Sequence, residues 1–449
     1  MKPFPYILAA ILLLAVPATL RAADHDIMRY GAVNDTTMLS TRAIQQAIDA
    51  CAAAGGGRVV VPAGHYATGT IRLRSHVDLH LEAGATLYGS TRLADYQPIA
   101  TSYLSLRTQT PTVQLIYADS ASHVSISGQG TIDGRGAAFP KLSWNDEGIT
   151  RPHLLRFIQC QDVAVTGVTL RNSGCWMQHY LACTRVRIDG VTIFNRNNYN
   201  SDALDLDGCH DVVVSNILAD SDDDGITLKS TSPRLCENSA IQNCIVSSHC
   251  NAIKLGTETN GGFRNITVSN CVVKPSAFQS SQFFGHPSKR GTSAISLEIT
   301  DGGTMENVSL SNILVEGTES PIFIRLGHRA RSYAEGIAVE QAGTIRGIRL
   351  SNISIAGAGP TGSSITGLPG HPVEDVWLSD ITISQQGGQQ QVAVPADEKE
   401  KDYPEATMWG VLPAKGFFVR HARNLNFRNI QITDIKPDKR PEYVKIDAE

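Results

Sequence analysis

Three aspartates are spaced so that they could share one chemical task. Asp202 lies in the segment NSDALDLDG, and Asp223 and Asp224 follow it in the segment DSDDDGITLKS. If the chain completes one turn between Asp202 and Asp223, the two segments lie on adjacent turns, roughly 5 Å apart. His249 follows Asp224 by a similar interval and would join them from the next turn. Crowded carboxyl groups raise each other's pKa, so one of them can stay protonated and serve as a general acid.

Spacing alone leaves simpler alternatives open. Isolated surface aspartates usually do no more than keep a protein soluble, and a ladder of carboxylates could bind calcium instead. An outward, solvated histidine is the corresponding alternative for His249. The choice depends on the elements that position these residues.

A short repeated pattern predicts those elements. Three or four alternating apolar positions precede a Gly, Asn or Asp, as in VRIDG, VVVSN, ITVSN and VSLSN. These corner residues are Gly128, Gly167, Gly190, Asn216, Asn243, Asn270, Asn312, Asn352, Asp380 and Asn429. The nearly constant interval between the central corners is typical of stacked short strands, and Gly or Asn tolerates the positive φ of a tight corner. We therefore predict an all-β fold, a right-handed parallel β-helix.

Alternation along the predicted strands gives each side chain a direction. The inward positions are Leu204, Leu206, Ile226, Leu228, Ile253, Leu255, Leu297 and Ile299. The outward positions, on the face where a polymer would lie, are Asp205, Asp207, Thr227, Lys229, Lys254, Ser296 and Glu298. The predicted acidic cluster therefore stands on an outer face of the solenoid.

The ends of the solenoid carry other signals. Ser40 and Thr41, followed by RAIQQAIDACAAA, predict a short amphipathic helix that caps the N-terminal end. Near the C-terminus we expect a long loop at 385–416 and a last turn at 424–435.

Residues 1–23 have the features of an export signal. Lys2 precedes an apolar stretch that is too short to span a bilayer, although a membrane anchor is the alternative interpretation. We expect residues 24–449 to form one β-helix domain that is secreted or periplasmic. No membrane contact is expected after the signal is removed.

Composition excludes several classes of partner. A net charge of −4 and a pI near 6.4 provide no basic surface for nucleic acid. Nine cysteines are an odd number, so at least one is free or pairs between chains. No C-x-x-C spacing predicts a zinc site. We expect a monomer that needs no cofactor and no metal.

The ordered motifs resemble those of the polygalacturonases, glycoside hydrolase family 28. The run Asn200-Ser201-Asp202 is similar to that family's Asn-Thr-Asp motif. Asp223-Asp224 resembles its Gly-Asp-Asp motif, with an aspartate at 222 in place of the glycine. His249 stands where the family has Gly-His-Gly, and the segments GGG-VVVPAG and LHLEAGATLYGS resemble the family's opening. The resemblance covers most of residues 27–435 and implies a pectin-lyase-like solenoid.

The resemblance also implies roles for the site residues. Asp223 would be the general acid that protonates the leaving oxygen, and Asp202 and Asp224 would activate the attacking water, giving inversion. His249 would tune the acid or hold the water, and Asn200 would contact substrate. The substrate would be a pectic polysaccharide or oligosaccharide.

One motif departs from the family pattern. The family's Arg-Ile-Lys, whose cations bind a galacturonate carboxylate, is replaced by Ser296-Leu297-Glu298. The local formal charge changes from +2 to −1, so a carboxylate beside Glu298 would be repelled. Unless Lys229, Lys254 or Arg325 replaces those cations, a neutral sugar is favoured, as in rhamnogalacturonan or substituted pectin.

Two alternatives remain at the sequence level. A β-eliminase resembling pectate lyase would need calcium-binding carboxylates and a basic residue that removes a proton beside a uronate. A β-helix that binds glycans without catalysis would need no general acid at all. The order of the motifs favours the hydrolase.

Overall fold

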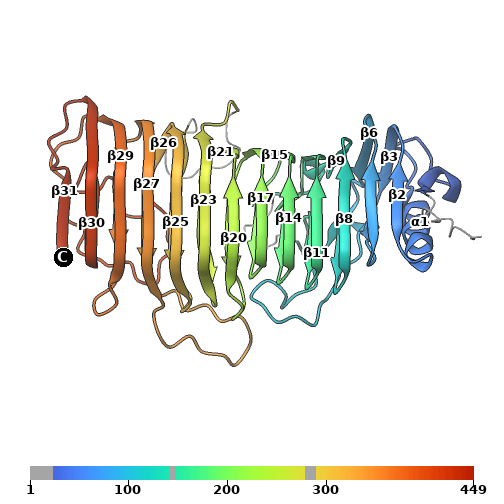
Figure 1. Ribbon diagram of the computed structural model, residues 1–449, viewed down its shortest axis with the longest axis horizontal. Helices are drawn as coiled ribbons and strands as arrows, with labels where there is room; N and C mark the ends of the chain where they lie inside the picture. The colour runs from blue at the N-terminus through green and yellow to red at the C-terminus, as the bar shows by residue number, and fades with distance from the viewer. Residues whose placement is uncertain (1–23, 142–147, 279–289) are drawn as a thin grey trace, which may run out of the picture.

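The computed structural model describes residues 24–141, 148–278 and 290–449. Within them the chain winds into an elongated solenoid whose strands stack side by side along the long axis (Figure 1). All 31 described strands belong to one sheet of parallel pairings. Connections between parallel strands are right-handed, and the predicted right-handed parallel β-helix is confirmed. The predicted export signal at 1–23 lies outside the described residues.

The first of three ladders of strands carries the acidic segments. Its strands are β4 (Ile71–Arg72), β7 (Gln114–Asp119), β10 (His153–Ile158), β13 (Gln178–Leu181), β16 (Leu204–Asp207), β19 (Ile226–Ser230), β22 (Asn251–Thr259), β24 (Gly291–Ile299), β26 (Thr318–Leu326) and β28 (Ser363–Thr366). Leu204 of β16 pairs with Ile226 of β19, which in turn pairs with Ile253 of β22. The segments that were predicted to be neighbours on successive turns are therefore neighbours.

The second ladder contains most of the predicted corners. Its strands are β1 (His25–Asp26), β2 (Gly57–Val61), β5 (Val77–Leu81), β8 (Ser122–Gly128), β11 (Gln161–Thr166), β14 (Thr184–Asp189), β17 (His210–Ser215), β20 (Cys236–Gln242), β23 (Gly262–Lys274), β25 (Thr304–Glu316), β27 (Thr344–Ala358), β29 (Val373–Gly387) and β30 (Phe417–Lys436). Asn312 has a φ of 56°, and its Nδ2 donates to Oδ1 of Asn270, one turn earlier, at 3.1 Å. The corner prediction is confirmed, and stacked asparagines bond from turn to turn.

The third ladder is shorter. Its strands are β3 (Gly64–Thr68), β6 (Ala85–Gly89), β9 (Thr131–Asp133), β12 (Thr169–Arg171), β15 (Thr192–Asn195), β18 (Leu218–Ser221) and β21 (Ile245–Ser248). Short 3-10 helices span Ile27–Tyr30, Leu93–Asp95 and Gly136–Ala138. The predicted turn at 424–435 lies inside β30, and β31 (Tyr443–Ala448) pairs with β30 beyond it. The solenoid therefore continues past the last predicted turn.

The core runs through the middle of the solenoid. Every predicted inward position, from Leu204 to Ile299, is at most 1% exposed. Burying one such aliphatic side chain contributes about 1.5–3 kcal/mol, so stacking the turns stabilises a fold that no single turn could hold. All nine cysteines are buried.

Helix α1 (Thr41–Ala53) closes the N-terminal end, as predicted (Figure 1). It buries one face made of Ala43, Ile44, Ala47, Ile48 and Cys51. Ser40 precedes the helix, but its side chain does not cap it. The Ser40 hydroxyl instead accepts a hydrogen bond from the backbone of Val33 at 3.0 Å.

Two long loops cover the outer surface of the first ladder. The loop 90–113 joins β6 to β7, and Tyr103 in it bonds through its hydroxyl to the hydroxyl of Ser232 at 2.8 Å. The loop 388–416 joins β29 to β30 and confirms the predicted loop, although β29 extends to Gly387. Residues distant in sequence therefore meet over this ladder.

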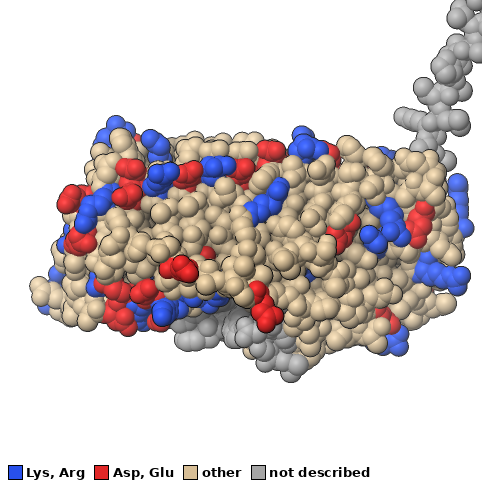
Figure 2. All heavy atoms as spheres, turned by 90° about the horizontal axis from the view of Figure 1, so that it is seen from below, with Lys and Arg blue, Asp and Glu red and all other residues tan. Residues whose placement is uncertain are grey.

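The molecular surface that Figure 2 draws carries both acidic and basic side chains, and broad areas of it carry neither. Acidic and basic side chains are interspersed there, with no large patch of one sign among the described residues. In the part of the chain that the structure describes, no helix is both long and apolar enough to cross a membrane.

Candidate active site

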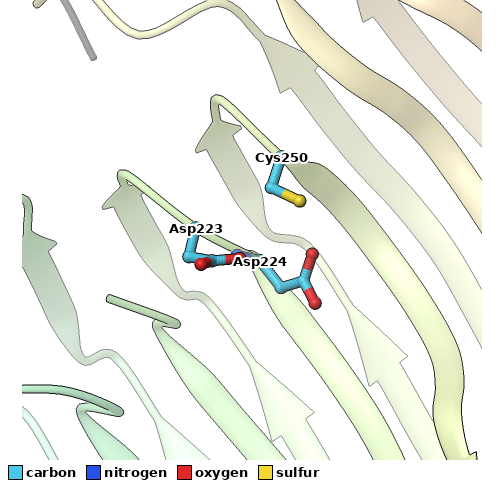
Figure 3. Close-up of side chains that lie close together, drawn as sticks. All are labelled: Asp223, Asp224 and Cys250. Carbon is cyan, nitrogen blue, oxygen red and sulfur yellow. The ribbon is translucent and has the colours of Figure 1, made fainter. Parts of the chain in front are cut away.

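The three aspartates lie on two adjacent turns, just before strands of the first ladder. Asp202 precedes β16, and Asp223 and Asp224 precede β19. The backbone N–H of Ala203 donates to the carbonyl of Asp224 at 2.9 Å, which fixes the register of the two segments. Asp202 and Asp224 are 3% exposed, while Asp223 is more accessible. Figure 3 shows the carboxyl groups of Asp223 and Asp224 beside each other on one turn.

Asp224 is surrounded by donors. Nζ of Lys254 lies 2.9 Å from its Oδ2, and Asn251 donates to its Oδ1 from Nδ2 at 2.9 Å and from the backbone at 3.2 Å. Burial raises the pKa of Asp224, but Lys254, Lys229 and these hydrogen bonds outweigh burial and leave the pKa below its ordinary value. Asp224 is therefore ionised at neutral pH.

The pKa of Asp223 moves in the opposite direction. Burial, followed by the charge of Asp224, raises the pKa of Asp223 to about 7. Its Oδ1 accepts a hydrogen bond from the backbone N–H of Asp224 at 2.9 Å, which opposes that rise only in part. Two adjacent carboxyl groups thus differ in protonation, the arrangement that acid–base catalysis requires.

Asp202 and Asp205 are two further carboxyl groups with a raised pKa. For Asp202 the main cause is burial and the second is the charge of Asp223, while Nζ of Lys229 at 3.8 Å opposes them. For Asp205 the causes are burial and then Asp202. Nζ of Lys229, 3.4 Å from Oδ1 of Asp205, opposes that rise. The cluster therefore holds more protons than surface aspartates would.

His249 lies on the next turn, between β21 and β22. Its Nδ1 is 2.9 Å from Oδ1 of Asp222, and Nη2 of Arg196 is 3.7 Å from the same oxygen. The alternative of a solvated histidine is wrong, because the residue is only 1% exposed. In a neutral ring, a hydrogen bond from Nδ1 to Asp222 leaves Nε2 as an acceptor. The aspartate that replaces the motif's glycine thus orients the histidine.

Lys229 and Lys254 are bound to protein carboxylates. Nζ of Lys229 lies 3.4 Å from both Asp205 and Glu258, in addition to its contact with Asp202. Burial lowers the pKa of each lysine, but the surrounding carboxylates outweigh burial and raise it well above the ordinary value. Both lysines therefore compensate internal negative charge.

The expectation that the outward positions of the first ladder lie exposed is wrong. The positions concerned, which are at most 4% exposed, are Asp205, Asp207, Thr227, Lys229, Lys254, Ser296 and Glu298. They point away from the core, but residues of two loops approach them. Tyr403 of the loop 388–416 contacts Lys254, and Arg107 of the loop 90–113 binds Glu258, the partner of Lys229. The resulting low dielectric is the reason for the strong pKa shifts.

Glu298 does not carry the negative charge that was expected from the sequence. It is fully buried, and the hydroxyl of Ser296 lies 2.5 Å from its Oε1. Burial raises the pKa of Glu298 to about 8, although Lys254 and Ser296 oppose the rise. The expected full negative charge is therefore absent near pH 7, and the protonated carboxyl can both donate and accept a hydrogen bond.

Arg325 and Asn200 both form hydrogen bonds with other parts of the protein. Nη2 of Arg325 donates to the carbonyls of Glu398 and Lys399, and its guanidinium lies 5.1 Å from the ring centre of Trp409. Arg325 therefore fastens the loop 388–416 to the solenoid. Asn200 accepts a hydrogen bond on its Oδ1 from Nη2 of Arg151 at 3.0 Å.

Three residues of this site were not predicted from the sequence. Glu258 binds Lys229 and also Nη2 of Arg107 at 2.5 Å. Nζ of Lys229 lies 4.6 Å from the ring centre of Trp176, and Tyr403 accepts a hydrogen bond from Lys254 at 3.4 Å. Only Trp176, which precedes Asp202 by one interval of the repeat, could have been found from the repeat spacing.

One group of side chains has ligand atoms close enough for a metal ion. Asp223, Asp224 and Cys250 bring one ligand atom each within 4.8 Å of one another (Figure 3). The ammonium of Lys254 already occupies Oδ2 of Asp224, and a second cation there would be repelled. This geometry favours proton transfer over metal binding.

Comparison with known proteins identifies the family. The model of the glycosyl hydrolases family 28 matches residues 51–399. The chain therefore belongs to the glycosyl hydrolases of family 28, and it is a glycoside hydrolase that acts on O-glycosyl bonds.

Individual relatives are distant. The chain is 25% identical over 385 residues to a probable polygalacturonase of Vitis vinifera, an alignment that covers 81% of this chain and 74% of that protein. It is 27% identical over 301 residues to an exo-poly-alpha-D-galacturonosidase of Dickeya chrysanthemi, covering 55% of this chain and only half of that protein. The family 28 exopolygalacturonase of Yersinia enterocolitica has the same fold, with a TM-score of 0.72 at 19% identity over 95% of this chain and 77% of that one.

Proposed function

We propose that this glycoside hydrolase cleaves glycosidic bonds in a pectic polysaccharide with inversion, and that Asp223 is its general acid. The observation that supports this proposal is the difference between adjacent carboxyl groups. Asp223, with a pKa of about 7, keeps a proton at mildly acidic pH, while Lys254 keeps Asp224 ionised. Asp223 is also the most accessible of the three aspartates, as a group that must reach the leaving oxygen has to be.

In the proposed reaction one carboxyl group gives a proton and another accepts one. Asp223 donates its proton to the glycosidic oxygen as the bond to the anomeric carbon breaks. Asp224 takes a proton from the water that attacks this carbon from the opposite side, which inverts its configuration. Asp202, whose pKa is raised, holds that water together with Asp224 and shares the cluster's proton with Asp223. His249 holds the acid's turn in place.

The proposed substrate is a pectic chain with a neutral residue near Glu298. The names of the Vitis and Dickeya relatives support the pectic class. Within the described residues, none of the three candidate cations is free to replace the Arg-Ile-Lys pair. Lys254 is bound to Asp224, Lys229 to Glu258 and Arg325 to the loop 388–416. A protonated Glu298 can form hydrogen bonds with a hydroxyl of a neutral sugar. This supports rhamnogalacturonan or substituted pectin, rather than plain polygalacturonate, as the substrate.

The burial of the site supports attack at a chain end. Asp202 and Asp224 are 3% exposed beneath two loops, and Gln109 of the first loop donates to the carbonyl of Tyr333 at 2.7 Å. A long polymer needs a groove that is open at both ends, whereas a terminal sugar needs only a pocket.

We propose secretion or a periplasmic location on the basis of residues 1–23.

A panel of pectic polymers and oligomers tests the proposal. The parent enzyme should release short products from at least one of them, identified by mass. Asp223→Asn should lose activity by about 10²- to 10⁴-fold, which is the usual contribution of a general acid. More than a tenth of the parent turnover in a folded Asp223→Asn variant would remove Asp223 from the acid role.

A further inference from the structure

A second group of buried polar side chains lies one to two turns N-terminal to the acidic cluster. Strands β10 and β13 and the loop 90–113 line a cavity of about 130 Å³. A single water needs about 10–15 Å³ of such space, so the cavity has room for on the order of ten waters, about the size of one sugar ring. The lining side chains that matter are Arg107, Thr112, His153, Arg156, Trp176 and His179.

Arg156 is the unusual member of this lining. It is 3% exposed, its Nη1 donates to the hydroxyl of Thr112, and its Nη2 donates to the carbonyl of Arg107 at 3.0 Å. Its Nε has no hydrogen-bond partner, and no carboxylate in the described parts of the chain pairs with Arg156 within 4.0 Å. Burial lowers the pKa of Arg156 to about 10 and the charge of Asp207 opposes the fall, so Arg156 stays charged. An unpaired buried cation is costly unless an anion binds it.

The two histidines of the cavity offer hydrogen bonds without charge. Burial, as the largest cause, lowers the pKa of His179 to about 4 and that of His153 well below its ordinary value. Nε2 of His179 lies 3.1 Å from a carboxylate oxygen of Asp207, which leaves Nδ1 as an acceptor. Nδ1 of His179 and Nδ1 of His153 both lack a partner within the described residues. Neutral imidazoles of this kind suit sugar hydroxyls.

The cavity is next to the reacting centre. Arg156 pairs in register with His179, and His179 pairs with Asp205. Trp176 lines the cavity. Nζ of Lys229 lies 4.6 Å from the centre of the Trp176 ring and 3.8 Å from Oδ2 of Asp202, so this lysine contacts both the cavity wall and the acidic cluster. Turns are about 5 Å apart, so the cavity lies roughly 5–10 Å from Asp202. This separation corresponds to the neighbouring sugar of a bound chain.

We propose that this cavity is a subsite for a uronic acid residue of the substrate, whose carboxylate binds Arg156 and whose hydroxyls bind His153 and His179. The inference rests on the proposed function, because it makes the cavity the sugar position beside the cleaved bond. Glu298 lies on the opposite, C-terminal side of the acidic cluster. The enzyme therefore selects a uronic acid on one side of the bond and a neutral sugar on the other, the alternation found in rhamnogalacturonan.

Binding to the inactive Asp223→Asn enzyme tests the subsite without turnover. Titration calorimetry with D-galacturonate, its methyl ester and D-galactose should show that galacturonate binds at least about tenfold more tightly, as expected for a charge-assisted hydrogen bond. Adding Arg156→Gln should abolish that difference. The matched control Arg428→Gln, at a side chain that is 74% exposed, should retain it.

Three results would overturn the subsite. These are equal binding of galacturonate and galactose with Arg156 intact, a preference for galacturonate that survives Arg156→Gln, and loss of the preference in the Arg428→Gln control. If Arg156→Gln does not fold, Arg156→Lys decides. Lysine keeps the charge but loses the fork of donors, so the affinity for galacturonate should fall several-fold while that for galactose stays the same. An unchanged galacturonate affinity contradicts the proposal.

The binding test and the proposed function can fail separately. If the parent enzyme cleaves no pectic polymer but Asp223→Asn binds galacturonate through Arg156, the proposed cleavage of pectic chains fails and the subsite stands. If the parent cleaves such a polymer but galacturonate is not preferred, the subsite fails and the proposed cleavage of pectic chains stands.

Discussion

Replacing Lys254 by methionine removes the ammonium group that keeps Asp224 ionised. Nζ of Lys254 lies 2.9 Å from the carboxylate, and the lysine is 1% exposed. At an effective dielectric constant of about 20, opposite charges at this distance attract by roughly 6 kcal/mol before desolvation is counted. In Lys254→Met, only Lys229 and Asn251 remain to oppose the effect of burial. The pKa of Asp224 should therefore rise.

The sign of the change in pH dependence follows from the proposed roles. The base must be deprotonated, so the acidic limb of kcat/KM should move upward by about 1 to 3 pH units, the usual effect of a nearby opposite charge. The basic limb reports the loss of the proton from Asp223, so it should lie near pH 7 in the parent. It should also rise, because Lys254 lowers the pKa of Asp223. The whole profile therefore moves to higher pH, while its maximum falls.

The assay is kcat/KM on one pectic oligosaccharide from about pH 3 to pH 9, with a thermal melt at each pH. Lys401→Met, which removes an exposed lysine of the loop 388–416, is the matched control and should leave both limbs in place. A folded Lys254→Met enzyme whose acidic limb does not move would refute the assignment of Asp224 as the base.

Three further predictions concern the same cluster. The Asp202→Asn and Asp224→Asn enzymes should each be severely impaired in kcat/KM. The double variant should be little worse than either, because both groups serve one water. Additive losses in kcat/KM would contradict a shared role. Early-time NMR should show products of inverted anomeric configuration, and net retention would require a nucleophile that the assignment lacks. Glu298→Gln should match the parent at pH 6, because glutamine resembles the protonated carboxyl, whereas a loss above tenfold in kcat/KM would show that a charged Glu298 is used.

Much of the site could be predicted because the repeat is local. The regular interval between corners and the alternation of apolar positions place Asp202, Asp223 and His249 on successive turns. In a solenoid each turn pairs only with its neighbours, so the register follows from spacing alone. Corner asparagines such as Asn312 were predicted for the same reason, since their positive φ is a property of one residue.

The protonation states and the second cavity were decided by the tertiary structure. Tyr103 reaches Ser232 and Tyr403 reaches Lys254 from loops that are distant in the sequence, and no periodicity predicts where such loops settle. Those loops turn outward positions into buried ones. Burial in a low dielectric then shifts pKa values, and it encloses Arg156 with no carboxylate of the described residues within 4.0 Å. The sequence by itself determined the solenoid and the order of its acids, because short-range spacing fixes both. Which acid keeps its proton depended on long-range contacts that only the folded chain creates.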